Sequence, residues 1–253
     1  MGTKRRVLMD DDDEVKIVHT KPKNRLEDYS VLLYGPPKIG KSTLASEWPK
    51  AIFLATETKG LKAMAVHAIK ISNWSQFRAA ISMAISSGKY ETAIVDTLDV
   101  AFQYCSDYCC KKFGFEHPSD EEWGKGWDIL SKEWWKEIIR LYNSKLTCIF
   151  VSHSKTVEIR SRFGTTSKTE MTLPYTGRRV LIPLVDIIMC MKPKTVVKGH
   201  GHTTEKRVVI CRPTESVEAG DRTDRLPAEI TVPKGGGFRK ISAVFKEGEG
   251  RKD

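Results

Sequence analysis

The stretch that decides the fold reads Gly35-Pro36-Pro37-Lys38-Ile39-Gly40-Lys41-Ser42. It fits the phosphate-loop pattern G-x-x-x-x-G-K-[ST] without a gap, and it lies between the apolar run Val31–Tyr34 and the helix-forming run Ser42–Trp48. Glycines let consecutive N–H groups face phosphates, and the following helix points its positive N-terminus at them. We expect the loop, through Thr43, to bind ATP, with Lys41 at the β- and γ-phosphates and Ser42 on Mg²⁺.

Two further apolar runs end in carboxylates. Thr92–Asp96 has the form of a buried parallel strand, and it would deliver Asp96 to the Mg²⁺ shell beside the loop. Ala51–Glu57 is a second such strand, and its last residue is acidic. Taken alone, Glu57 could instead make only a turn or a helix cap with Thr58, because acidic residues often open helices.

The order of these features resembles the RecA-like branch of phosphate-loop ATPases, and in particular the phage single-strand annealing recombinases with their minimal RecA core. The resemblance implies that Glu57 is the base that polarises the attacking water. It also implies that His153, at the end of the run Cys148–His153, senses the γ-phosphate where relatives use glutamine. The alternative for His153 is a solvated residue at a strand end, and the imidazole would make a sensor titratable.

The polar stretch from Ser154 to Thr176 is too long for an ordinary connection, and we expect a loop there. In the family that the sequence resembles, this region holds single-stranded DNA, by neutralising phosphates and stacking bases on aromatic rings such as Phe163 and Tyr175. A solvated loop that only maintains solubility is the alternative. The candidate DNA-binding cations are Lys155, Arg160, Arg162, Lys168, Arg178 and Arg179.

The segment Lys206–Pro213, together with Glu218–Pro227, resembles the C-terminal hairpin of the same family. The resemblance implies that Arg212 reaches the γ-phosphate of a neighbouring subunit, and therefore that the chain forms a homo-oligomer, a filament or a ring. Arg222 and Arg225 are further candidates for this role. Arg212 could instead be a cation that discourages pairing at an edge strand.

Composition is consistent with these expectations. The chain has 253 residues, is 40% hydrophobic, and carries a formal charge of +10, which favours an acidic partner such as nucleic acid. Its six cysteines lack the spacing of a zinc site, and we expect them to be reduced core residues. The sequence shows no apolar leader and no long apolar span, so we expect a cytoplasmic protein without a membrane partner, in the host cytoplasm if it is phage-encoded.

Helical stripes alternate with apolar runs near Val31, Ile52, Ile94, Ile149 and Ile187, which predicts an α/β fold. We expect a mainly parallel twisted sheet with right-handed crossovers, flanked by helices, with a C-terminal β-hairpin. Three regions follow: a flexible charged arm over residues 1–28, a RecA-like ATPase core over 29–232, and a flexible tail over 233–253, where three glycines occur together.

The functional hypothesis is a Mg²⁺-dependent, DNA-stimulated ATPase that binds single-stranded DNA and promotes annealing in recombination, with a single-strand-binding protein as a further partner. Three alternatives share the phosphate loop: a replication helicase or loader ATPase, a small-molecule kinase, and a DNA-binding protein that ATP only switches. ATP turnover measured with and without single-stranded DNA separates most of them, because a kinase ignores DNA and a switch barely turns over.

Overall fold

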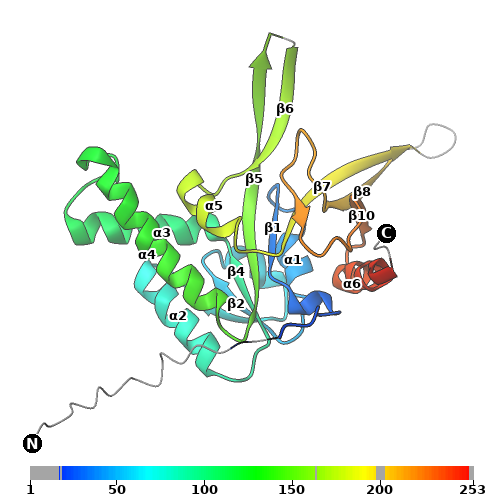
Figure 1. Cartoon of the computed structure of the whole chain (residues 1–253), viewed down its shortest axis with the longest axis horizontal. Helices are drawn as coiled ribbons and strands as arrows, with labels where there is room; N and C mark the ends of the chain where they lie inside the picture. Colours follow the sequence, from blue (N-terminus) through cyan, green and yellow to red (C-terminus); the bar gives the residue numbers. More distant parts are fainter. Residues whose placement is uncertain (1–16, 18, 163, 198–202, 251–253) are drawn as a thin grey trace, which may run out of the picture.

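A single large sheet organises the chain, and the computed structural model describes residues 17, 19–162, 164–197 and 203–250 (Figure 1). The strand order is β10-β8-β7-β1-β5-β4-β2-β3, with β6 paired to β5 and β9 to β7. The strands are β1 (Val31–Gly35), β2 (Ala51–Ala55), β3 (His67–Lys70), β4 (Thr92–Asp96), β5 (Thr147–Ser161), β6 (Gly164–Met171), β7 (Ile187–Val197), β8 (Thr203–Ile210), β9 (Gly220–Asp221) and β10 (Glu229–Val232). The α-helices are α1 (Lys41–Ala45), α2 (Trp74–Ser86), α3 (Leu98–Phe113), α4 (Lys125–Tyr142), α5 (Tyr175–Leu181) and α6 (Gly237–Glu247).

The centre of the sheet is parallel, as the sequence predicts. β1 lies between β5 and β7, and β4 lies between β5 and β2, all in parallel register. Every residue of β1 and β4 is buried, which explains why these strands read as continuous apolar runs. β8, β9 and β10 complete the sheet in antiparallel register. The predicted α/β class with antiparallel C-terminal strands is confirmed.

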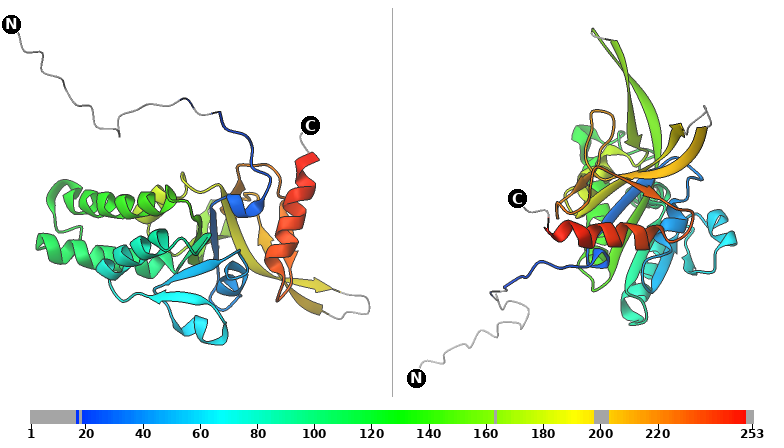
Figure 2. Two further views of the ribbon diagram at one scale, coloured as in Figure 1. Left: turned by 90° about the horizontal axis from the view of Figure 1, so that it is seen from below. Right: turned by 90° about the vertical axis from the view of Figure 1, so that its right-hand side faces the viewer.

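Helices cover both faces of this sheet (Figure 2). Along β1, Leu32 and Tyr34 pack with α2, α3, α4 and α5 on one face, and Val31 and Leu33 pack with α1 and α6 on the other. On the first face Trp134 is fully buried, and its ring lies 5.8 Å from that of Trp74, centroid to centroid. Trp134 is therefore a packing residue of the core.

The polar stretch after His153 is not the loop that we expected. β5 continues to Ser161 and pairs antiparallel with β6, in register from Ser154 with Met171 to Ser161 with Gly164. The two strands form an arm that projects from the body of the molecule (Figure 1). The prediction was wrong because the apolar alternation that marks a strand arises from burial of one face, and most of this ribbon is exposed.

The C-terminal tail is also not as predicted. The core was expected to end at residue 232 and a flexible tail to follow, yet Gly237–Glu247 forms α6, in which Ile241 and Phe245 are fully buried. The carboxylate of Glu47 accepts hydrogen bonds from the N–H groups of Gly236 (3.0 Å) and Phe238 (2.8 Å), so α6 docks beside the end of α1.

At the other end of the chain, the predicted arm over residues 1–28 lies mostly outside the described residues. Its last part is a short 3-10 helix, Leu26–Asp28, whose Leu26 is fully buried. The core therefore begins before residue 29. All six cysteines are free thiols, five of them buried, as expected for a reduced core. Within the described ranges, no helix combines the length and apolarity needed to cross a bilayer.

Candidate nucleotide-binding site

The carboxyl ends of the central parallel strands meet at one edge of the sheet, and the phosphate loop starts there. Gly35, the last residue of β1, is in register with His153 of β5. A Cβ at Gly35 would collide with the carbonyl oxygen of Met191, and Gly40 adopts φ +104° with the guanidinium of Arg207 against it. Both glycines of the motif are therefore required by backbone geometry and close approach.

Lys41 is buried, with 5% of its surface exposed. Its ammonium group donates to the carbonyl oxygens of Gly35 (2.9 Å) and Pro36 (3.0 Å), and thus lies folded inside the loop. Burial lowers the pKa of Lys41, and the nearby carboxylates of Asp96, Asp99 and Glu57 oppose that shift. The loop therefore holds one cation in a position enclosed by backbone dipoles, ready for an anionic ligand.

His153 lies between Lys41 and Glu57. Its Nδ1 is 3.2 Å from the ammonium nitrogen of Lys41, and its Nε2 is 3.4 Å from Oε1 of Glu57. Because an ammonium group only donates, Nδ1 is the acceptor and the ring proton lies on Nε2, facing Glu57. Glu57 also accepts a hydrogen bond from the hydroxyl of Thr97 (3.1 Å), so its carboxylate faces the site instead of capping the next helix.

Asp96 ends β4 and is buried, with 4% exposed. Burial raises the pKa of its carboxyl group, and a hydrogen bond with the side chain of Ser42 opposes that shift. This contact brings together the two residues expected on Mg²⁺. No group of three His, Cys, Asp or Glu side chains suited to a metal occurs in the described part of the chain. One carboxylate and one hydroxyl nevertheless fit Mg²⁺, which takes its other ligands from water and nucleotide phosphates.

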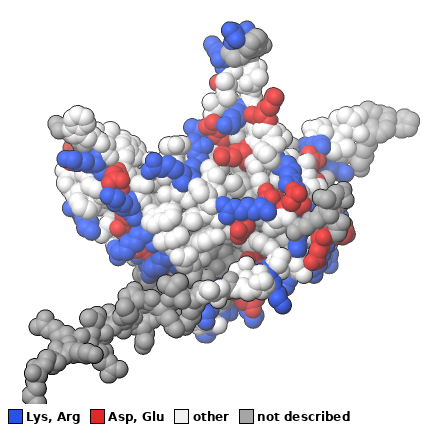
Figure 3. Space-filling view, in the orientation of Figure 1, with Lys and Arg blue, Asp and Glu red and all other residues white. Residues whose placement is uncertain are grey.

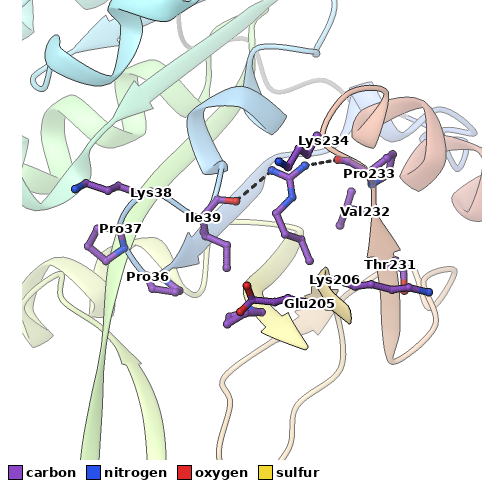
Figure 4. A pocket seen from close by; sticks show the side chains of 12 residues that line it. Pro36, Pro37, Lys38, Ile39, Glu205, Lys206, Thr231, Val232, Pro233 and Lys234 are labelled. Carbon is purple, nitrogen blue, oxygen red and sulfur yellow. Dashed lines mark hydrogen bonds between the residues drawn. The ribbon is translucent and has the colours of Figure 1, made fainter. Parts of the chain in front are cut away.

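A cavity of about 740 Å³ opens beside the loop (Figure 4). The loop residues Pro36–Ile39 form one wall, and residues of β8 and β10 with Pro233 and Lys234 form the other. Arg207 of β8 joins the two walls by donating to the carbonyl oxygens of Ile39 (3.2 Å) and Pro233 (2.5 Å).

Sequence reasoning missed Arg207 of β8 and selected Arg212, which lies two residues beyond the end of that strand. The register explains the difference. Arg207 is opposite Pro193, beyond the position at which β1 ends, so it lies beside the phosphate loop. Arg212 follows the other end of β8, and it forms an ion pair with Asp224 (2.5 Å) and donates to Leu226 O (3.1 Å).

The two further arginine candidates are also engaged within the chain. Arg222 donates to the carbonyl oxygens of Pro183 and Leu184. Arg225 is 5% exposed, its guanidinium carbon lies 5.1 Å from the ring centroid of Phe245, and it donates to Asn24. Both side chains hold loops and α6 in place.

The candidate DNA-binding cations lie on and beside the arm. In an antiparallel pair, directly opposite residues share a face, so Lys155, opposite Glu170, and Lys168, opposite Val157, lie on one face of the ribbon. Arg160 lies on the other face, and Arg162 follows the end of β5. Basic side chains cluster at the far end of the arm in Figure 3. Arg178 and Arg179 lie on α5, not on the arm.

Comparison with known proteins gives a family. A KaiC-like protein of Pyrococcus horikoshii OT3 matches 82% of this chain and 90% of its own, at 13% identity and a TM-score of 0.43. The SPbeta prophage-derived uncharacterized protein YorG of Bacillus subtilis (strain 168) is 29% identical over 168 residues, 64% of this chain, and the match spans about half of that relative's length (49%). The AAA_24 family, described as an AAA domain, matches residues 27–223, which include the phosphate loop, Glu57, Asp96 and His153. The chain therefore belongs to the AAA_24 family of phosphate-loop ATPase domains.

Proposed function

We propose that this chain is a Mg²⁺-dependent ATPase whose β5–β6 arm binds single-stranded DNA, and that it anneals complementary strands. One observation carries the proposal: a single strand, β5, serves both parts. Its residue His153 contacts Lys41 and Glu57, and Lys155 and Arg160 follow on the projecting half of the same strand. The proposed nucleotide site and the basic, exposed ribbon are thus connected by one continuous strand, without an intervening loop.

The chemistry assigned to the site is hydrolysis of the γ-phosphate. Lys41 neutralises the β- and γ-phosphates, and Ser42 with Asp96 would hold Mg²⁺, which supplies further positive charge to the transferred group. Glu57 accepts the proton of the attacking water as general base. His153, with its proton on Nε2, donates a hydrogen bond to the γ-phosphate once that group takes the place beside Lys41.

The nucleoside part of ATP fits the cavity beside the loop. Proline rings from both walls, among them Pro37 and Pro233, offer flat apolar surfaces to a base. Lys206, Arg207 and Lys234 add positive charge on the wall facing the loop. This composition suits a ligand with an apolar ring and an anionic tail.

Single-stranded DNA suits the arm because the ribbon offers cations and apolar atoms without a deep groove. Lys155 and Lys168 share their face with Ile159, which is 45% exposed. At the base of the arm, Tyr175 is 70% exposed at the start of α5, which also carries Arg178 and Arg179. Cations that follow the phosphates and an exposed ring that stacks a base are the elements of binding without sequence preference.

The first test is ATP turnover with and without single-stranded DNA, combined with a DNA-binding titration at several salt concentrations. Replacement of Arg160, Arg162 and Lys168 by alanine should weaken binding at every sequence and lower the slope of log K against log salt by about 0.7 per lost contact. The charge-matched control replaces Lys89, Lys111 and Lys145, which are exposed outside the arm. Equal affinity and slope in the two triple variants would assign the arm to a protein partner. ATP turnover that ignores DNA would favour a kinase.

Annealing is tested separately, with two complementary labelled oligonucleotides, with and without ATP and with and without a single-strand-binding protein. The name of the Bacillus relative places that protein in a prophage, a setting that suits the annealing class. Acceleration of duplex formation by the wild-type chain, lost in the arm variant, supports the proposal. Translocation along DNA without annealing would indicate a helicase or loader motor instead.

Assembly into a homo-oligomer belongs to the same proposal. Arg212 lies away from the phosphate loop of its own chain, so a phosphate that it contacts belongs to another copy. Mixing Arg212→Ala with Lys41→Ala subunits should restore turnover that neither has alone, because one supplies the loop and the other the arginine. A wild-type rate per chain that is independent of concentration, together with no restoration, would leave Arg212 as the partner of Asp224 only.

A further inference from the structure

Asp99 binds the base of the arm at three points. It lies in the first turn of α3, three residues after Asp96, and its carboxylate faces β5. Oδ2 accepts a hydrogen bond from the N–H of His153 (3.1 Å), and Oδ1 accepts bonds from the hydroxyls of Ser152 (3.1 Å) and Thr172 (2.5 Å). Thr172 follows the end of β6, so one carboxylate holds both sides of the arm.

The arm leaves the sheet at this place. The last pairs of β5 with its parallel neighbours are His153 with Gly35 on β1 and Val151 with Asp96 on β4. From Ser154 onward β5 pairs with β6. The N–H of Thr172 donates to the carbonyl oxygen of His153 (3.0 Å), which closes the ribbon beside Asp99. His153 and Thr172 therefore lie at the junction between the ribbon and the sheet, so a tilt of the ribbon would displace these two residues before any others in the sheet.

The same His153 carries the ring that contacts Lys41 and Glu57. Its backbone is held by Asp99 on one side and by Thr172 on the other, so the position of the ring depends on both contacts. A charge-assisted hydrogen bond to a carboxylate is shorter and stronger than a neutral one, which makes Asp99 an effective link between the helix that follows Asp96 and the arm.

We propose that Asp99 and Thr172 are positioning residues that couple the arm to the phosphate site: occupancy of the loop changes how firmly the base of the arm is held, and a strand bound on the arm changes the position of the His153 ring. This inference rests on the proposed function for the identity of the ligand on the arm. The coupling itself requires only nucleotide at the loop. By linkage, nucleotide and arm ligand must affect each other's binding by the same factor.

The matched pair Thr172→Val and Thr172→Ser tests the coupling, because valine keeps the shape and removes the hydroxyl, and serine keeps the hydroxyl. The measurement is hydrogen exchange of the arm, residues 154–171, with and without Mg²⁺ and a non-hydrolysable ATP analogue. We expect the analogue to slow exchange in the wild type and in Thr172→Ser, and to have less than about half that effect in Thr172→Val. Affinity for the analogue, from a fluorescent-nucleotide titration, should differ by less than about 2-fold among the three.

A second variant addresses Asp99 itself. Asp99→Asn weakens the hydrogen bonds to His153 and Thr172, and Asp107→Asn on the exposed side of the same helix is its control. We expect Asp99→Asn to lower kcat by about 10-fold with little change in KM, because a misplaced His153 affects the transition state more than ATP binding. A loss of folding alone would instead lower the active fraction, which the stoichiometry of nucleotide binding reports.

The outcomes separate the inference from the function on which it rests. An arm that responds to the analogue equally in Thr172→Val and the wild type overturns the coupling, and so does a wild-type arm that ignores a bound analogue. The wild-type chain could bind no single-stranded DNA while its arm still responds to the analogue through Thr172. That result would support the coupling and would contradict DNA as the ligand of the arm. If the wild-type chain binds no nucleotide at all, both the coupling and the proposed function are contradicted.

Discussion

The two halves of β5 have the same backbone conformation and opposite surroundings. From Cys148 to Ser152 the strand is buried in the parallel sheet between β1 and β4. From Lys155 to Arg160 it pairs only with β6, and most of its side chains meet solvent. A residue in the first half lies between two neighbouring strands, whereas the second half has only β6 beside it. The fold thus places a buried segment beside the phosphate loop and an exposed ribbon on one continuous strand.

The largest expected effect belongs to the phosphate loop, which lies beside the buried half of β5. Lys41→Ala should abolish detectable turnover, a loss of about 10³-fold or more, because Lys41 is the cation enclosed by the loop. Turnover and nucleotide affinity are measured beside Lys89→Ala, which removes an exposed lysine from the turn before β4. Unchanged turnover in Lys41→Ala would contradict the assignment of the loop.

Glu57→Gln separates nucleotide binding from hydrolysis at the same site. Glutamine keeps the shape and the acceptor oxygen that Thr97 uses, but it cannot take a proton from water. We expect ATP affinity to remain and kcat to fall by about 10²-fold, the scale of a lost general base. Glu116→Gln, an exposed change near the tip of the α3–α4 pair, is the control. Wild-type turnover in Glu57→Gln would mean that another residue is the general base.

The exposed half should be removable. Thr156 and Thr169 are paired, so residues 157–168 can be replaced by Asn-Gly, a two-residue turn that suits an antiparallel pair. We expect affinity for single-stranded DNA to fall by about 10-fold or more, and nucleotide affinity to change by less than about 2-fold. Thermal unfolding and both titrations check this. Loss of nucleotide binding would show that the two halves of β5 are not independent in stability.

The smallest expected effect concerns burial of charge. Burial raises the pKa of Asp96, so the folded state disfavours its ionised form, and this cost is present at neutral pH and disappears as the pH falls through the raised pKa. Asp96→Asn should therefore raise the melting temperature of the nucleotide-free protein by a few degrees at pH 7 and by less at acidic pH. The same variant should respond more weakly to Mg²⁺ in ATP binding. A lower melting temperature at pH 7 would show that the hydrogen bond with Ser42 outweighs the cost.

The sequence predicts the phosphate loop and the buried strands around it well because the constraints on them are local. A phosphate loop needs glycines at fixed spacing, and strands buried on both faces read as apolar runs, so Gly35, Lys41 and Asp96 could be located in advance. The proximity of His153 to Lys41 and Glu57 follows from the register of β5 with β1. The roles of these residues in catalysis stay predictions.

The arm could not be predicted in the same way. Its strands have no buried face to produce alternation, although Thr156, Val157, Ile159, Thr165 and Thr166 are β-branched, and Gly164 marks the turn. The contact of Arg207 with the phosphate loop could not be predicted because it depends on the pairing of β7 with β8, which no local sequence pattern reveals. For α6 the signal was present: Phe238, Ile241, Val244 and Phe245 form a helical stripe after the glycines.

The docking of α6 has a practical consequence for anyone who prepares this protein. A fragment that ends at residue 232, the boundary suggested by the glycines, would lack Ile241 and Phe245 and uncover the apolar surface of Leu26 and Leu44. Such a fragment would expose apolar core surface to solvent and would tend to aggregate. A poor yield of the fragment would therefore reflect the missing helix and not an intrinsic instability of the ATPase domain.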